Sequence, residues 1–255
     1  MGSTVHDKKD WFERDLEAIS KTNGFLSPLS FRYLEQIRGK PLEIPFLQAL
    51  SLNLALPLAG HFGPLILDGL TALTPPVARA LASHGGVLSL NGLKELDSSC
   101  VLFLKNHEGP LQLSGLLELP LNTAKLLAEH RGDLQLNGLI TLSDESALAL
   151  ADHRGSLCLD RLGIFSDRAA YAISTHEGDL SLHALAEYSL HQPLYGEGFA
   201  SLLRRIRPQD SASPRTPMTT IASLTPQNHG AELLDQALSF SDEPLEDPFT
   251  PRFGW

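Results

Sequence analysis

Cysteine and basic residues are both scarce in this sequence. Cys100 and Cys158 are the only cysteines among 255 residues. The repeat register described below places them on different elements of different repeats, so no disulfide is expected, as is typical of a reducing cytosol. The 20 Lys and Arg are outnumbered by 30 Asp and Glu, giving a formal net charge of −10. Nucleic-acid binding needs clustered Lys and Arg against phosphates and is therefore not expected.

Long apolar runs and common catalytic motifs are also lacking. No apolar run reaches the ~18 residues of a membrane span, and the segment Met1 to Trp11 is polar, unlike a signal peptide. The sequence has no Gly-x-Ser-x-Gly elbow, phosphate-binding loop or Cys-x-x-Cys pair. We expect a cytoplasmic protein with no membrane span, enzymatic activity or cofactor; non-classical secretion into a host cell is the alternative.

A histidine recurs every 23 residues, and a glycine follows each one by two positions. The histidines are His61, His84, His107, His130, His153 and His176, and the glycines are Gly63, Gly86, Gly109, Gly132, Gly155 and Gly178. An unbroken register over six copies predicts one supersecondary unit stacked on itself, a solenoid. We call the six histidines the histidine ladder.

Each repeat contains a short strand. In the copy that begins at His130, Leu134 and Leu136 alternate with Gln135 and Asn137, and this period of two predicts a strand with one buried face. A Gly-Leu pair follows, as in Gly138-Leu139.

Each repeat then contains a helix. Ala147, Leu150 and Ala151 have the spacing of one helical face. The residue expected to cap each helix N-terminus is, in order, Thr74, Asp97, Pro120, Ser143, Ser166 and Ser189. Proline is a poor cap, so Asn122 is expected to cap its helix one turn late. Gly155 is expected to reverse the chain after the helix in a left-handed conformation.

The segment Leu134–Leu139, Leu-Gln-Leu-Asn-Gly-Leu, resembles the leucine-rich-repeat superfamily, most closely its short bacterial variants. The resemblance covers residues 40–190 and departs from the family in lacking a strict asparagine ladder after the strand. It implies an α/β solenoid of about seven repeats forming a right-handed arc. The parallel sheet would lie on the concave face and short helices on the convex face, and protein binding would be the usual role.

The flanking regions suggest four parts in the chain. Residues 1–38 are predicted to be a helical N-terminal cap, with an independent docking helix pair as the alternative. Residues 39–190 form the solenoid, and residues 191–207 a C-terminal capping helix. Residues 208–255, rich in proline and acidic residues, are predicted to be a disordered tail that carries a linear motif or packs loosely.

The concave face is the first candidate for binding. Its outward strand positions are expected to be Ile66, Asp68, Ser89, Asn91, Gln112, Ser114, Gln135, Asn137, Cys158, Asp160, Ser181 and His183. This surface is polar and slightly acidic and lacks the aromatic and arginine anchors that usually carry binding energy. In the second column, Asp68, Asn91, Asn137 and Asp160 have an alternative role, bonding the neighbouring turn.

The histidine ladder is the second candidate. Each ring follows a helix, where it can donate to free helix carbonyls or to the turn of the next repeat, and we favour this structural role. Stacked rings spaced at ~4.8 Å are a metal-binding alternative, although ladder side chains run parallel and metal ligands converge. Acid should loosen the stack, because several neighbouring imidazoles cannot all carry charge.

Cys158, Asp160 and His183 form the third candidate, a thiol-enzyme group; the simpler interpretation of Cys158 is an ordinary exposed cysteine. The sequence as a whole favours a non-catalytic, monomeric protein–protein interaction module, such as a scaffold or bacterial effector. It would recognise a protein through its concave sheet and its tail. A metal-binding or thiol enzyme is the alternative.

Overall fold

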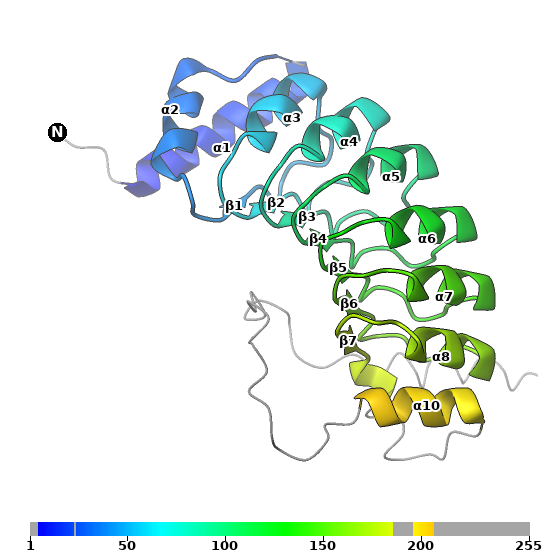
Figure 1. The fold of residues 1–255 in the computed structure, drawn as a ribbon. Coiled ribbons are helices and arrows are strands. Elements are labelled where there is room, and N and C mark those ends of the chain that lie inside the picture. Colours follow the sequence, from blue (N-terminus) through cyan, green and yellow to red (C-terminus); the bar gives the residue numbers. More distant parts are fainter. Residues whose placement is uncertain (1–4, 23, 186–195, 207–255) are drawn as a thin grey trace, which may run out of the picture. The chain divides into compact units, whose positions relative to one another are not determined.

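The computed structural model describes residues 5–22, 24–185 and 196–206, in which helices and short strands alternate along the chain (Figure 1). The helices are α1 (Val5–Thr22), α2 (Pro28–Gln36), α3 (Leu52–Ala59), α4 (Pro75–Leu81), α5 (Ser98–Leu104), α6 (Leu121–Ala128), α7 (Asp144–Ala151), α8 (Asp167–Ser174) and α10 (Glu197–Ile206). The strands are β1 (Leu42–Glu43), β2 (Leu65–Ile66), β3 (Leu88–Ser89), β4 (Leu111–Gln112), β5 (Leu134–Gln135), β6 (Leu157–Cys158) and β7 (Leu180–Ser181). The predicted tail, the cap at Ser189 and Arg207 lie outside the described residues.

The strands form a 7-stranded parallel sheet in chain order, β1 to β7. Each strand residue pairs with the residue 23 positions further on, as Leu134 pairs with Leu157 and Gln135 with Cys158. Parallel neighbours need a crossover connection, and each helix supplies one. Helices α3 to α8 lie in a row along one side of the sheet (Figure 1). This α/β solenoid arrangement is the one that the 23-residue register predicts.

One hydrophobic core runs through all the repeats. The strand residues Leu134 and Leu136 and the helix residues Ala147 and Leu150 are fully buried. Their counterparts in the other repeats are buried too, except Leu180 of the last repeat, which is half-buried. A single repeat cannot bury enough apolar surface to offset the conformational entropy lost in ordering it, so the repeats fold as a stack. Side chains of α1 and α2 join the same core, among them Phe12, Leu16 and Leu34.

The N-cap positions predicted for α4 to α8 are confirmed. Asp97 accepts a hydrogen bond from the Ser99 backbone N–H, and Ser143 and Ser166 accept equivalent bonds from Ser146 and Ala169. Thr74 and Pro120 occupy the cap positions of α4 and α6 without a side-chain hydrogen bond. The expectation that Asn122 caps its helix is wrong, because α6 already begins at Leu121.

The left-handed conformation expected at Gly155 is also wrong. Within the described residues a positive φ occurs only at Gly39, Gly63 and Gly196. Gly155 is needed for space instead, because a Cβ there would lie 2.4 Å from the carbonyl oxygen of Gly132. The glycines that follow the ladder histidines thus let successive turns approach each other closely.

Candidate functional site

The first-column residues of the sheet form one row across the strands. Backbone pairing places Ile66, Ser89, Gln112, Gln135, Cys158 and Ser181 side by side. The row is not uniformly open to solvent as expected: Ser89 and Cys158 are only 1% and 7% exposed, whereas Gln112 and Gln135 between them are half-buried.

The second-column residues bond the neighbouring turn, and that alternative is confirmed at three of them. The backbone N–H groups of Asn91 and Asp160 donate to the side chains of Asp68 and Asn137, at 3.0 Å in each case. The Asn91 side chain accepts from the Ser114 N–H at 2.7 Å. The row is interrupted at Ser114, whose hydroxyl is too short to take the place of an Asn or Asp side chain. We call Asp68, Asn91, Asn137 and Asp160 the sheet-side ladder.

Two serines are also engaged by this ladder. Ser89 donates to Asp68 at 2.6 Å, and Ser181 donates to Asp160. Within the described residues, by contrast, no hydrogen bond engages the side-chain amides of Gln112 and Gln135. The side-chain amides of the two central glutamines are therefore free to bind something else.

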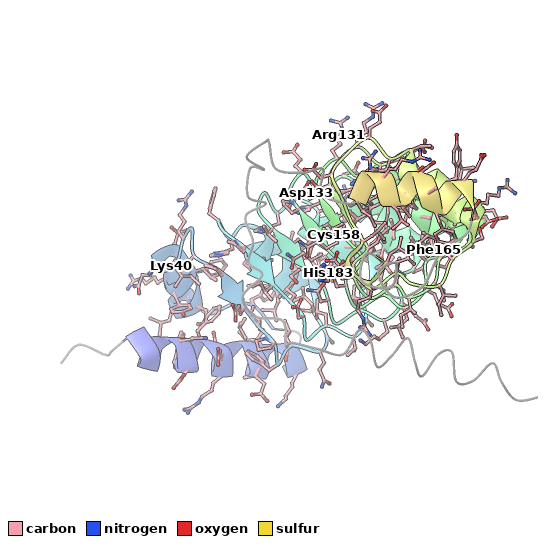
Figure 2. All side chains as sticks on the ribbon, turned by 90° about the horizontal axis from the view of Figure 1, so that it is seen from below. Lys40, Arg131, Asp133, Cys158, Phe165 and His183 are labelled. Atoms are coloured by element: carbon pink, nitrogen blue, oxygen red, sulfur yellow. The ribbon has the colours of Figure 1, made fainter. Side chains whose placement is uncertain are left out.

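Cys158 does not have the properties of a nucleophile. It lies on β6, while Asp160 and His183 follow β6 and β7 (Figure 2). Burial raises the pKa of the Cys158 thiol to about 12, and the carboxylates of Asp160 and Asp133 add to that shift. A thiol with this pKa stays protonated at neutral pH, whereas the thiolate is the reactive form. Buried Cys158 is also not the exposed cysteine of the simpler interpretation.

The histidine ladder is buried along its whole length, with His61 6% exposed and the other five rings at most 1%. From His84 to His176, neighbouring rings lie within 6° of parallel, with centroids 5.9–6.2 Å apart. This spacing is wider than the ~4.8 Å expected from the distance between strands.

The first two rings make the backbone contacts expected of a structural ladder. His84 Nδ1 lies 3.3 Å from the carbonyl oxygen of Ala59, the last residue of α3, and His61 Nε2 lies 2.8 Å from that of Lys40. The nitrogens of the four later rings (His107, His130, His153 and His176) also have backbone carbonyls nearby. No group of the described residues reaches hydrogen-bond geometry with these nitrogens.

Burial is the main cause of a lowered pKa along the ladder, from His84 through His176. At His130 it brings the pKa down to about 4, and the neighbouring histidines contribute to that shift. These rings are therefore neutral at pH 7. Among the residues that the structure describes, no group of three or more His, Cys, Asp or Glu side chains is arranged to hold a metal ion.

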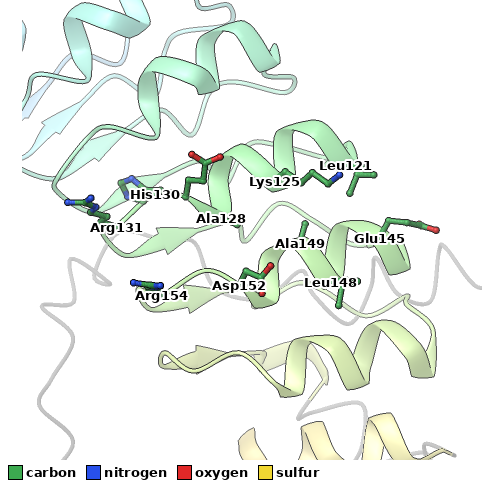
Figure 3. Close-up of a pocket in the computed structure, with 11 residues that line it drawn as sticks. Leu121, Lys125, Ala128, His130, Arg131, Glu145, Leu148, Ala149, Asp152 and Arg154 are labelled. Carbon is green, nitrogen blue, oxygen red and sulfur yellow. The ribbon is translucent and has the colours of Figure 1, made fainter.

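A further surface feature, missed in the sequence, lies between α6 and α7 (Figure 3). It is an open groove of about 850 Å³ that combines apolar side chains such as Leu121 and Leu148 with charged ones such as Lys125, Arg154 and Asp152. Leu148 is 60% exposed. The signal was present in the sequence, because Leu148 falls off the helical face defined by Ala147, Leu150 and Ala151.

Comparison with known protein families, with characterised proteins and with solved structures gives no match for this chain. Among the helices that the structure describes, none combines the length and apolar character of a membrane span.

Proposed function

We propose that this chain is a leucine-rich-repeat protein whose sheet lines the concave side of a right-handed arc. It acts as a non-catalytic module that binds a protein partner across this sheet. The ladder spacing supports the curvature: the rings are 5.9–6.2 Å apart, whereas adjacent strands lie ~4.8 Å apart. Neighbouring repeats are therefore further apart at the histidines than at the strands. This difference bends the stack so that the sheet lies on the inner side of the arc.

The observation that carries the binding role is the pair of glutamines at the centre of the sheet. Gln112 and Gln135 are adjacent in the β4–β5 register, and their side-chain amides have no hydrogen-bond partner among the described residues. Beside them, the sheet-side ladder fixes the backbone through hydrogen bonds to neighbouring turns. Amides on such a rigid surface can bind a partner at a small cost in conformational entropy.

The buried Cys158 supports a role without catalysis. Its raised pKa, about 12, keeps the thiol protonated, so the group with Asp160 and His183 lacks an activated nucleophile. As a scaffold or a host-delivered effector, the protein would need only the binding surface.

Affinity capture from cell lysates tests the binding role. Gln112→Arg and Gln135→Arg put a long cation into the sheet face and should abolish capture of a partner that the native chain retains. Leu148→Arg places the same side chain on the helix layer and is the matched control, and Cys158→Ser should also capture normally. Ser89 is unsuitable for this test because it is buried and bonded to Asp68.

A chain ending at Pro208 provides a third comparison. Loss of the partner only on truncation would assign binding to residues 209–255 instead of the sheet. Equal capture by all variants, with native circular dichroism, would exclude the sheet face as the binding surface. Activity lost in Cys158→Ser alone would favour the thiol enzyme.

A further inference from the structure

Helix α10 packs directly on α8, at the end of the row of repeats (Figure 1). The backbone N–H of Phe199 donates to the Asp167 carboxylate at 2.9 Å, and the Phe199 ring packs on Phe165 with centroids 5.3 Å apart. Leu202 is fully buried, and Gly198 lies so close to α8 that a Cβ there would be 1.9 Å from the Asp167 carbonyl oxygen. The position of α10 on the last repeat is therefore closely defined.

Successive ladder histidines lie beside equivalent backbone carbonyls. One belongs to the residue 25 positions earlier in the chain and the other to the residue 21 positions earlier. For His84 these are Ala59 and Gly63, and for His176 they are Ala151 and Gly155. The backbone of the residue three positions later, Val87 or Asp179, lies beside the ring as well. A neutral imidazole has one N–H, so it cannot donate to the two earlier carbonyls together.

The next pair of carbonyls, 23 residues further on, belongs to Ser174 and Gly178. No seventh histidine approaches them at the repeat distance, because position 199 is Phe199. The guanidinium of Arg205 donates to both instead, through Nη1 to Ser174 at 3.4 Å and through Nη2 to Gly178 at 2.5 Å. Its several N–H groups satisfy two acceptors that a neutral imidazole cannot satisfy together.

We propose that Arg205 is the closing member of the histidine ladder and that Arg205 and His176 form a proton-sensitive latch that holds α10 on the last repeat. While His176 is neutral, the guanidinium binds the two carbonyls and α10 stays docked. A proton on the buried His176 sets its charge against that of the exposed Arg205 guanidinium, and α10 then separates.

The groups around His176 shift its pKa in the direction that this latch requires. Burial lowers the pKa of His176, and the charge of Arg205 lowers it further, against the opposing effect of the Ala151 carbonyl. His153 is a further titratable neighbour, and its ring is stacked on that of His176 from the preceding repeat. Undocking α10 exposes His176 and returns its pKa toward ~6.5. Acid therefore favours the undocked state, and docking weakens as the pH falls below that value.

Hydrogen exchange of the α10 amides in the full-length protein, expressed as protection factors at pH 7 and pH 5, tests the latch. In the native chain, protection of α10 should fall about tenfold at the lower pH, while protection of α5 should change less. His176→Gln removes the titrating ring and should abolish the fall. Arg205→Met should reduce α10 protection already at pH 7, whereas the matched control Arg204→Met should behave as the native chain.

Asp167 also contacts α10 through its carboxylate, so Asp167→Asn separates its contribution; the fall should persist in this variant. The latch is wrong if native α10 protection is the same at both pH values or if His176→Gln shows the native fall. It is also wrong if Arg205→Met is as protected as the native chain at pH 7. Should His176→Gln fail to fold, as judged by circular dichroism, the comparison of Arg205→Met with Arg204→Met decides.

Discussion

The solenoid contains two polar ladders, and they differ in how their polar groups are partnered. The sheet-side ladder contains both Asp and Asn and is interrupted at Ser114, yet its side chains accept hydrogen bonds from neighbouring turns. The histidine ladder does not vary from His61 to His176, yet most of its ring nitrogens have no hydrogen-bond partner among the described residues. An invariant polar residue in a repeat is therefore not evidence that its side chain is hydrogen-bonded.

Solvent access explains this difference. Ser114 and its neighbours on the sheet face are partly exposed, so water can replace a missing side-chain acceptor. The ladder histidines are buried between stacked repeats, where each flat ring packs parallel to the next. Replacing one of them would leave a cavity or a mismatched shape, so the ladder is constrained by packing. The three predictions below probe this contrast in order of decreasing effect.

Acid should destabilise the solenoid through the histidine ladder. The folded pKa of His130 is about 4, below its ordinary 6.5, so the unfolded chain takes up the proton first. Stability is fully present above pH ~6.5 and is lost as the pH falls toward the folded pKa, by about 2 kcal/mol at pH 5 for His130 alone. The other lowered rings add to this loss. Urea unfolding at pH 7.5 and pH 5 measures it.

Two variants make that measurement specific. His130→Leu removes one titrating ring and should reduce the difference in unfolding free energy between the two pH values. Gln135→Leu, which introduces the same side chain without removing a histidine, should leave the difference unchanged. Equal unfolding free energies of the native chain at both pH values would refute a proton-sensitive ladder.

The sheet-side turns should tolerate no side chain at their glycines. A Cβ at Gly138 would lie 2.3 Å from the carbonyl oxygen of Ser114 and 2.5 Å from that of Leu116. Gly138→Ala should therefore cost about 3 kcal/mol, as expected where rigid backbone is overpacked. Gly85→Ala is the matched control, because a Cβ there meets nothing within 4 Å. Thermal unfolding followed by circular dichroism compares the two, and equal midpoints would contradict the close approach.

The sequence predicted the repeat itself because periodicity reports directly on packing. The 23-residue register became the strand pairing Leu134 with Leu157, and the serine before α7 became its N-cap. It did not predict why Gly155 is glycine, because the clash is with a turn of the preceding repeat. The burial of Cys158 was missed for the same reason: alternation gives the face of a strand but not what surrounds it.

The contact of Arg205 with Ser174 and Gly178 could not be predicted from the sequence either. Arg205 lies 29 residues after His176 and so falls off the 23-residue period. In the sequence it was one of several arginines in the last turn of a predicted capping helix. Its role depends on where α10 docks, and α10 is not part of the repeat.

The smallest expected effect concerns single members of the sheet-side ladder. Asn137→Ala removes the acceptor of the Asp160 N–H and should cost about 1 kcal/mol, the usual net value of one hydrogen bond. Ser114→Asn restores the missing member and should gain a fraction of that amount, because its neighbour already has access to water. Gln135→Ala is the control in the adjacent column, since its amide has no partner among the described residues, and should change stability least. Urea unfolding at neutral pH ranks the three variants. If Asn137→Ala were as stable as Gln135→Ala, the sheet-side ladder would contribute no more than the solvent that can replace it, and the contrast between the two ladders would lie in burial alone.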